Sequence, residues 1–359
     1  MIVGVLGGGQ LARMLAQAGH DLGLKVVFID PAADACAGPV AEQLQGAFDD
    51  QALLAQLADI ADVVTYEFEN VPDASIDFLS SRVPVYPSAQ ALAAAQDRLI
   101  EKTLFQQLGI QAAEFARVDS LEDLQAAVER IGLPAILKTR RLGYDGKGQA
   151  MLRSVDDLAD AWESIGKVPA ILEAFVPFSR EVSVIAVRDR EGQTRFYPLS
   201  ENTHRNGILH LSICREGDSM QEQAEGYARR LLEHLNYTGV IALELFQVGE
   251  QLLANEFAPR VHNSGHWTTE GAETSQFENH MRAVAGLPLG ETTPVGYAAM
   301  INCIGDMPDV ASVLAIPHAH VHAYGKAARA GRKVGHITVR TTDGASRDEL
   351  CDKVLELIP

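Results

Sequence analysis

The N-terminus opens with a short apolar segment, residues 2–6, which runs directly into three glycines at positions 7–9. Residues 10–20 then carry apolar side chains at helical spacing, and residues 25–29 form a second apolar segment that ends at Asp30. A buried strand, a tight turn, a helix and a second buried strand are the first unit of a doubly wound parallel sheet. Parallel neighbours need a crossover connection of this kind, so this segment constrains the fold strongly. It predicts an α/β domain at the N-terminus.

The alternation continues to about residue 96. Residues 49–60 predict a helix, and residues 62–66 and 83–86 predict two further strands. We therefore expect a Rossmann-like domain over residues 1–96.

The glycine turn itself leaves its ligand open. The spacing Gly7-x-Gly9-x-x-Ala12, followed by Asp30, fits the alanine variant of the dinucleotide fingerprint. Glycines let the backbone approach a phosphate, and the following helix N-terminus favours a negative charge. The same turn also opens many α/β domains that bind no nicotinamide. NAD, a phosphate of another ligand, and glycines needed only for close strand–helix packing are the three alternatives.

Length and charge limit the function classes. A chain of 359 residues is too long for one ordinary domain and suits two or three. The formal net charge of −18 would repel a nucleic acid, although a local cluster of Arg and Lys near the C-terminus still suits a small anionic substrate. The four cysteines are far apart without a C-x-x-C pair, and no apolar segment is long enough to span a bilayer. We expect a cytoplasmic protein with reduced thiols and without membrane or nucleic-acid partners.

After residue 96 the pattern changes to mixed α+β. Residues 135–138 and 149–152 read as strands on either side of a glycine-rich loop, and later alternating segments predict a larger, mainly antiparallel sheet. We assign a central domain to residues 97–290, with a flap subdomain at about 112–178, and a small β-rich domain to residues 291–359.

A lysine stands at the end of the first of these strands. Lys138 is followed by two arginines and by the loop from Gly143 to Gln149, which holds three glycines. A strand-end lysine provides a fixed charge for a phosphate, and a glycine-rich flap can close over it with its amides. A surface hairpin would explain the glycines but not the cations. A P-loop is excluded because G-K-[ST] does not follow.

Two glutamates lie in otherwise apolar strands. Glu244 follows residues 240–243, Glu256 follows 252–255, and a hairpin centred on Glu250 places the two opposite each other. Their Cβ atoms should then lie about 5 Å apart. Two facing carboxylates are unfavourable unless a cation bridges them, and hard oxygen ligands select Mg²⁺, which commonly shares its remaining sites with phosphate oxygens. A shifted register, with one glutamate exposed, is the alternative.

Taken together these features resemble the ATP-grasp superfamily, and within it the 5-(carboxyamino)imidazole ribonucleotide synthase family. The resemblance covers essentially the whole chain. It is carried by the motifs Gly7-Gly8-Gly9-Gln10-Leu11, Tyr66-Glu67-Phe68-Glu69-Asn70-Val71, residues 143–149, residues 255–266, Tyr324-Gly325-Lys326 and Arg332-Lys333-Val334-Gly335-His336. It implies an ATP-grasp fold with a Rossmann-like N-terminal domain and a small C-terminal domain.

For the nucleotide, the resemblance implies phosphate contacts from Arg98 and Lys138, a flap over residues 143–149, an adenine hinge over residues 173–176 and a ribose contact at Glu181. The implied ATP-binding residues are Arg98, Lys138, Gly143, Tyr144, Asp145, Gly146, Lys147, Gly148, Gln149, Glu173, Ala174, Phe175, Val176, Glu181, His204, Asn255 and Glu256. Glu244 and Glu256 are the implied ligands of Mg²⁺, with Mn²⁺ as a substitute.

For the second substrate, the resemblance implies catalytic roles for Arg260, Lys326, Asp145, Tyr144 and His262. The implied substrate-binding residues are Gln10, Leu11, Glu67, His262, Asn263, Ser264, Lys326, Arg332 and Lys333. The implied reaction uses ATP and bicarbonate to carboxylate aminoimidazole ribonucleotide through carboxyphosphate, and members of the family are commonly homodimers. Ala258 stands where many ATP-grasp enzymes have an asparagine that contacts metal, which leaves the rest of the metal shell open.

Three other functions compete with this one. A formate-using transformylase or a biotin carboxylase lacks its own motifs here, and a nicotinamide oxidoreductase would use the Gly7 turn and Asp30. A nucleotide sensor without catalysis is disfavoured by the intact Lys138, Glu244 and Glu256. Of the remaining residues, the alternating His318, His320 and His322 read as a surface or interface strand. Trp162 is expected in the core, and Trp267 as a wall of the substrate site.

Overall fold

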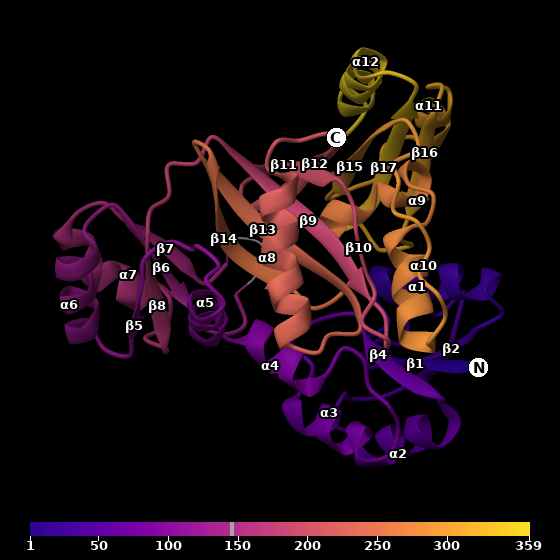
Figure 1. Cartoon of the computed structure of the whole chain (residues 1–359), viewed down its shortest axis with the longest axis horizontal. Coiled ribbons are helices and arrows are strands. Elements are labelled where there is room, and N and C mark those ends of the chain that lie inside the picture. The colour runs from indigo at the N-terminus through magenta and orange to yellow at the C-terminus, as the bar shows by residue number, and fades with distance from the viewer. Residues whose placement is uncertain (144–146) are drawn as a thin grey trace.

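The structure is a computed structural model that describes residues 1–143 and 147–359 (Figure 1). The predicted site residues Tyr144, Asp145 and Gly146 lie outside the described residues. Three sheets build the described part of the chain. They are a parallel sheet at the N-terminus, a small antiparallel sheet that projects to one end, and a large antiparallel sheet that includes the C-terminal strands.

The N-terminal sheet has the strand order β3-β2-β1-β4, with parallel neighbours throughout. Its strands are β1 (Ile2–Leu6), β2 (Lys25–Asp30), β3 (Glu42–Gln45) and β4 (Val63–Tyr66), and its helices are α1 (Gln10–Asp21), α2 (Gln51–Ile60), α3 (Asp73–Ser80) and α4 (Ala89–Gln96). The predicted doubly wound domain is confirmed. The predicted strand at 83–86 is only an isolated bridge from Val85 to Val64, while β3 and α3 were not predicted.

The small sheet has the order β5-β8-β6-β7 and lies at the left of Figure 1 with α6 and α7. Its elements are β5 (Phe115–Val118), α6 (Leu121–Ile131), β6 (Ala135–Thr139), β7 (Gln149–Leu152), a short 3-10 turn (Val155–Asp157), α7 (Leu158–Ser164) and β8 (Ala170–Ala174). Helix α5 (Arg98–Gln107) precedes it. Trp162 is buried in the core of this unit, as predicted.

The large sheet has the order β14-β13-β9-β11-β12-β15-β17-β16, and β10 pairs with β9. Its strands are β9 (Arg180–Arg188), β10 (Thr194–Phe196), β11 (Leu199–Arg205), β12 (Ile208–Arg215), β13 (Gly239–Val248), β14 (Gln251–Ala258), β15 (Tyr297–Ile304), β16 (Ala319–Ala323) and β17 (Lys333–Thr341). Its helical segments are α8 (Gln221–His234), a 3-10 turn (Asn263–Gly265), α9 (Thr268–Gly271), α10 (Gln276–Ala285), α11 (Val310–Leu314) and α12 (Gly344–Leu355). The C-terminal strands thus continue the central sheet, because β15 pairs with β12.

One hydrophobic core joins the N-terminal domain to the large sheet. Helix α1 packs against α10, where Met281 lies against Gly19, and the shared cluster runs from Val3 to Tyr324. This contact fixes the glycine turn relative to the large sheet, so both can contribute to one site.

The β13–β14 hairpin brings Glu244 opposite Glu256, which confirms the predicted pairing. The turn is shorter than predicted, however, because Val248 already pairs with Gln251. A one-residue irregularity after Glu244 places Asn255 outside the regular pairing and restores the register. Such a bulge re-aims side chains, and here it lies beside the two carboxylates.

Candidate functional site

A cavity of about 560 Å³ lies where the N-terminal domain, the small sheet and the large sheet meet. Sixteen predicted site residues line it: Gln10, Leu11, Glu67, Arg98, Lys138, Gly143, Gln149, Glu181, His204, Glu244, Asn255, Glu256, Arg260, His262, Asn263 and Lys333. Residues far apart in the sequence therefore converge on one space, as the predicted roles require.

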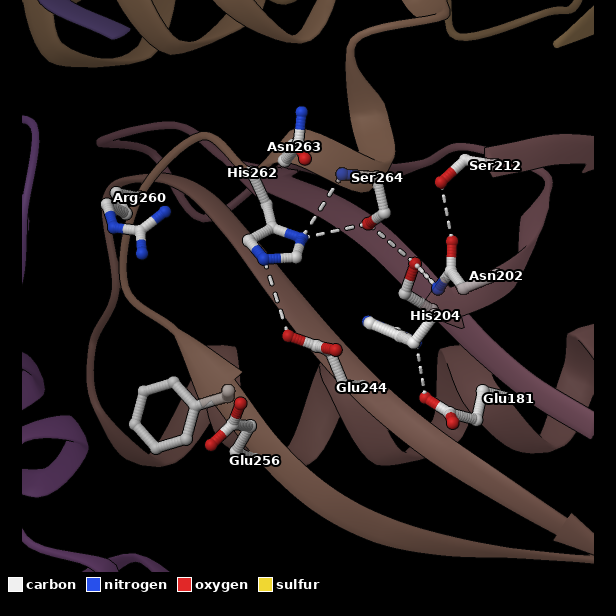
Figure 2. A network of polar contacts seen from close by, with 12 residues as sticks. Glu181, Asn202, His204, Ser212, Glu244, Glu256, Arg260, His262, Asn263 and Ser264 are labelled. Carbon is white, nitrogen blue, oxygen red and sulfur yellow. Dashed lines mark hydrogen bonds and ion pairs between the residues drawn. The ribbon is translucent and has the colours of Figure 1, made fainter. Parts of the chain in front are cut away.

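The two glutamates of the hairpin have different partners. Arg98 donates a hydrogen bond of 2.6 Å to Glu256 Oε2. Glu244 Oε1, by contrast, lies 3.3 Å from His262 Nε2 (Figure 2). Burial and the neighbouring Glu256 raise the pKa of Glu244, while Arg98 overcomes the effect of burial and lowers the pKa of Glu256. The neighbouring cations thus more than offset the burial of Glu256, whereas His204 and Lys333 offset that of Glu244 only in part.

Next to this pair is a cluster of buried lysines around one carboxylate. Lys138 Nζ lies 3.0 Å and Lys102 Nζ 3.4 Å from the same oxygen of Glu173. Burial opposes ionisation of Glu173, but the two lysines overcome it and lower its pKa to about 2. Lys102 also donates to the Ala254 carbonyl oxygen. Glu173 thus positions Lys138, the predicted phosphate ligand, at the floor of the cavity.

The predicted adenine hinge, residues 173–176, begins at the end of β8. The amides of Ala174 and Phe175 already donate to the carbonyl oxygens of Glu114 and Pro134. Nearby, Phe178 and Phe246 line the cavity with stacked rings whose centroids are 4.6 Å apart. Sequence analysis missed both phenylalanines because their stacking depends on the pairing of β13 with β9.

The predicted ribose contact, Glu181, is held by a histidine. His204 Nδ1 lies 2.8 Å from Glu181 Oε2, and Figure 2 shows both side chains beside Glu244. Burial lowers the pKa of His204, but Glu181 overcomes this and raises it.

The predicted catalytic cations are held by residues of the N-terminal domain. Arg260 Nε donates a 2.6 Å hydrogen bond to Glu69 Oε2, and Lys326 Nζ donates to Gln10 Oε1. Glu69 had no predicted role, although it stands in the same motif as Glu67. Arg332 donates to the Ala327 carbonyl oxygen, which ties down the loop that carries Lys326.

The glycine turn is occupied by carboxylates of the chain itself. The Gly8 amide donates to Asp30, and the amides of Gly9 and Ala12 donate to Glu67, the latter at 2.9 Å. Glu67 is therefore the anion at the N-terminus of α1, and a dinucleotide phosphate would have to displace it. This arrangement removes the basis for the nicotinamide alternative.

Several predicted residues are not part of the cavity lining. Within the described residues, the lining does not include Lys147, Gly148, Glu173, Ala174, Phe175, Val176, Ser264, Lys326 or Arg332. One further interpretation was wrong, because Trp267 is fully buried and donates to Ser200 rather than forming a wall of the site. His320 and His322 lie partly exposed on the edge strand β16, as the surface interpretation predicted, and His322 there stacks on His336 at 4.3 Å and contacts Glu270.

The carboxylate pair fits a hard divalent cation. Each glutamate has one oxygen engaged by Arg98 or His262, which leaves the other oxygen to face a ligand. In the bulge beside them, Asn255 Oδ1 is buried without a hydrogen-bond partner among the described residues. Carboxylate and carbonyl oxygens suit Mg²⁺, and two carboxylates are enough when substrate phosphates complete the shell. Consistently, the described chain holds no cluster of three or more His, Cys, Asp or Glu side chains suited to a metal.

Three family models match this chain. The ribonucleotide synthetase preATP-grasp domain matches residues 1–96, the ATP-grasp domain matches residues 103–277, and the phosphoribosylaminoimidazole carboxylase C-terminal domain matches residues 298–349.

Relatives and solved structures agree with these matches. The N5-carboxyaminoimidazole ribonucleotide synthase of Pseudomonas aeruginosa is 56% identical over 100% of this chain and 99% of its own length. The N5-carboxyaminoimidazole ribonucleotide synthetase of Thermus thermophilus superposes with a TM-score of 0.96 at 54% identity, covering 99% and 98% of the two chains. The Aspergillus clavatus synthase, solved in complex with ADP and 5-aminoimidazole ribonucleotide, has a TM-score of 0.93 at 31% identity, again covering 99% and 98%.

Proposed function

This chain belongs to the N5-carboxyaminoimidazole ribonucleotide synthase family of ATP-grasp ligases, and from that premise we propose how its cavity works. The enzyme carboxylates 5-aminoimidazole ribonucleotide at the expense of ATP, a step of purine biosynthesis. The observation that carries the proposal is the carboxylate pair of Glu244 and Glu256 opposite the cations Arg98 and Lys138, all lining one cavity.

The proposed carboxyl donor is bicarbonate. An oxygen of bicarbonate attacks the γ-phosphorus of ATP, the bond to the β–γ bridging oxygen breaks, and ADP leaves. The resulting carboxyphosphate transfers its carboxyl group to the exocyclic amine of the substrate. The bond between the carboxyl carbon and the phosphate oxygen breaks, and the amine loses one proton as inorganic phosphate departs.

The chain contributes position and charge rather than a covalent nucleophile. Carboxyphosphate carries several negative charges and reacts with water, so it needs fixed cations and a closed site. We assign these cations to Arg260, held by Glu69, and to Lys326, held by Gln10. Because each head group is already bonded, little reorganisation is needed when the anion forms.

The ATP phosphates are assigned to Arg98 and Lys138. Glu244 and Glu256 would hold Mg²⁺, which neutralises phosphate charge when bound. Glu181 is assigned to the ribose. Of the hinge residues 173–176, Val176 is assigned to adenine, because the amides of Ala174 and Phe175 are already used within the fold.

The remaining assignments concern the setting of the enzyme. We divide the chain into domains at 1–96, 97–290 and 291–359, and propose a homodimer in the cytoplasm. All four cysteines lie in the described structure as free thiols, which suits a reducing compartment. No helix among the described residues has the length and apolar character needed to cross a bilayer.

A bicarbonate-dependence assay tests the proposal. ADP release is measured with aminoimidazole ribonucleotide and Mg²⁺, in bicarbonate-depleted buffer and after bicarbonate is restored. Turnover should rise with bicarbonate and should yield one carboxylated product for each ADP. Turnover that ignores bicarbonate would contradict the carboxyl donor. Labelling bicarbonate with ¹⁸O sharpens the test, since the proposed bond order leaves one labelled oxygen in the released phosphate.

A further inference from the structure

A chain of buried hydroxyl and amide groups leads from the interior of the large sheet to His262 (Figure 2). Ser212 Oγ donates to Asn202 Oδ1 at 2.7 Å, and Asn202 Nδ2 donates to Ser183 Oγ at 3.0 Å. Ser183 Oγ donates to Ser264 Oγ at 2.7 Å, and Ser264 Oγ lies 2.9 Å from His262 Nδ1. Beyond His262 the chain ends on Glu244, at 3.3 Å from Nε2.

The strand order of the sheet creates this chain. Ser183 on β9 lies directly opposite Glu244 on β13, and Asn202 on β11 lies opposite Ser212 on β12. Ser183, Ser212 and Ser264 are fully buried. Bulk solvent therefore does not reach these hydroxyls, and each takes its hydrogen-bond partners from its neighbours.

The neighbours on the two sides of the His262 ring fix which of its nitrogens carries the proton. At one end the backbone amide of Ser264, which can only donate, also lies 3.4 Å from His262 Nδ1. At the other end the Glu244 carboxylate, when ionised, can only accept. Both ends require His262 to accept at Nδ1 and to carry its proton on Nε2. For this tautomer each hydroxyl of the hydrogen-bond chain donates to its neighbour on the His262 side.

The reverse tautomer would break the pattern at three places. A proton on Nδ1 would face the Ser264 amide and would turn the Ser264 hydroxyl into an acceptor. The Ser264 hydroxyl, which already accepts from Ser183, would then accept twice, and its own proton would lose Nδ1 as its acceptor. Finally, the bare Nε2 lone pair would face the Glu244 carboxylate.

We propose that Ser183, Asn202 and Ser212 are positioning residues that, through Ser264, hold His262 as the Nε2–H tautomer and thereby fix the orientation of Glu244. His262 then acts as a hydrogen-bond donor to the carboxylate and does not take the proton from the substrate amine at Nε2. One oxygen of Glu244 is held by the imidazole, and the other is left for the cation. This inference rests on the proposed function, since it concerns the metal ligand assigned there.

The tautomer is read directly from nitrogen chemical shifts. Protein labelled with ¹⁵N in its histidines is measured metal-free in EDTA by long-range ¹H–¹⁵N correlation, and the His262→Gln spectrum assigns the signal. Wild type should show Nδ1 unprotonated and Nε2 protonated. In Glu244→Gln the side-chain amide can donate or accept, so the Ser264 amide and the hydroxyl chain fix the tautomer, and the Nε2–H pattern should persist. The double variant Glu244→Gln with Ser183→Ala frees the Ser264 hydroxyl to accept from Nδ1, and it should show a detectable fraction of the Nδ1–H tautomer that Glu244→Gln alone lacks.

A second measurement follows the metal ligand. Binding of Mn²⁺ to the ADP complex, followed by electron paramagnetic resonance, should weaken about tenfold in Ser183→Ala, the size expected when a group supporting a metal ligand is lost. Ser75→Ala is the matched control, because Ser75 is also buried and its hydroxyl has no partner in the described structure. It should change neither readout.

Each outcome decides the inference. A protonated Nδ1 in wild type would overturn it, and so would Ser183→Ala behaving like Ser75→Ala in both measurements. Should Ser183→Ala fail to fold, Ser212→Ala at the far end of the chain should produce a several-fold loss of Mn²⁺ affinity, and no loss would overturn the inference. Absence of Mn²⁺ binding in wild type would instead contradict the proposed metal site, while the tautomer result would still decide the hydrogen-bond chain.

Discussion

The glycine turn after β1 and the carboxylate pair on β13 and β14 are both suited to binding an ion, yet the chain treats them in opposite ways. At the turn, Asp30 and Glu67 accept hydrogen bonds from the free backbone amides. The partial positive charge at the N-terminus of α1 is therefore already neutralised. At the hairpin, Glu256 is paired with Arg98, whereas Glu244 contacts the neutral imidazole of His262, and the charges of His204 and Lys333 offset its burial only in part. Burial and the positively charged Arg260 and Lys333 lower the pKa of His262 to about 3.

The difference separates a structural motif from a functional one. A fingerprint that resembles a dinucleotide site holds the fold together, because its donors are satisfied internally. A pair of like charges left without a full set of counterions stores a cost that a bound cation removes. The exogenous ion should therefore bind where the chain leaves charge unbalanced.

Removing one ligand of the pair should have the largest effect. Glu256→Gln should leave the fold intact and reduce Mg²⁺-dependent turnover on the order of a thousandfold, because several kcal/mol of charge stabilisation is lost. Steady-state ADP release with circular dichroism as the folding check measures both. The exposed Glu250→Gln in the hairpin turn is the control. Near-wild-type turnover in Glu256→Gln would sink the metal assignment.

A methyl group added at the glycine turn should lower the stability of the fold rather than the rate of the reaction. A Cβ atom at Gly9 would lie 2.5 Å from Glu67 Oε1, so Gly9→Ala must push this carboxylate away from the amides it neutralises. We expect a loss of about 1 to 3 kcal/mol in the free energy of unfolding, measured by urea denaturation. Gly226→Ala in helix α8, with open space around it, should be neutral or slightly stabilising. An unchanged free energy in Gly9→Ala would mean that the turn is not held by Glu67.

The unbalanced charge should appear as a pH dependence of the metal-free protein. Burial and Glu256 raise the pKa of Glu244 from its usual 4.5 to about 7, so the folded state binds more protons than the unfolded state between these two values. The contribution of Glu244 to stability should then fall as pH rises through this window, opposite in sign to that of His262, whose pKa is lowered. Glu244→Gln should remove this fall and gain about 1 to 2 kcal/mol at neutral pH in EDTA. If the stability of Glu244→Gln depended on pH as that of wild type does, an unfavourable charge on Glu244 in the metal-free protein would be contradicted.

Sequence analysis found the elements whose pattern is local. The opening strand, turn and helix, the glycine-rich segment after Lys138 and the facing glutamates all follow from spacing within a few tens of residues. In the hairpin, the predicted pairing was correct only because two deviations cancelled. The predicted turn was one residue too long, and the bulge at Asn255 cancelled the error, so Glu244 still faced Glu256.

What it missed depends on the order of strands in the large sheet. Ser183, Asn202 and Ser212 have no motif, and they meet His262 only because β9, β11 and β12 are neighbours. Glu69 is similar, since its partner Arg260 lies 191 positions away. The contacts of His322 were missed because alternation along β16 predicts a face of the strand and not what packs against it.

Metal binding to matched variants tests the central claim most directly. Mn²⁺ is titrated into the ADP complex of wild type, Glu244→Gln and Glu256→Gln, with Glu67→Gln as a buried glutamate whose carboxylate is satisfied by the glycine turn. The account predicts that either hairpin variant loses on the order of a hundredfold in Mn²⁺ affinity while Glu67→Gln binds as wild type does. Equal affinity in all four proteins, or a loss confined to Glu67→Gln, would contradict it.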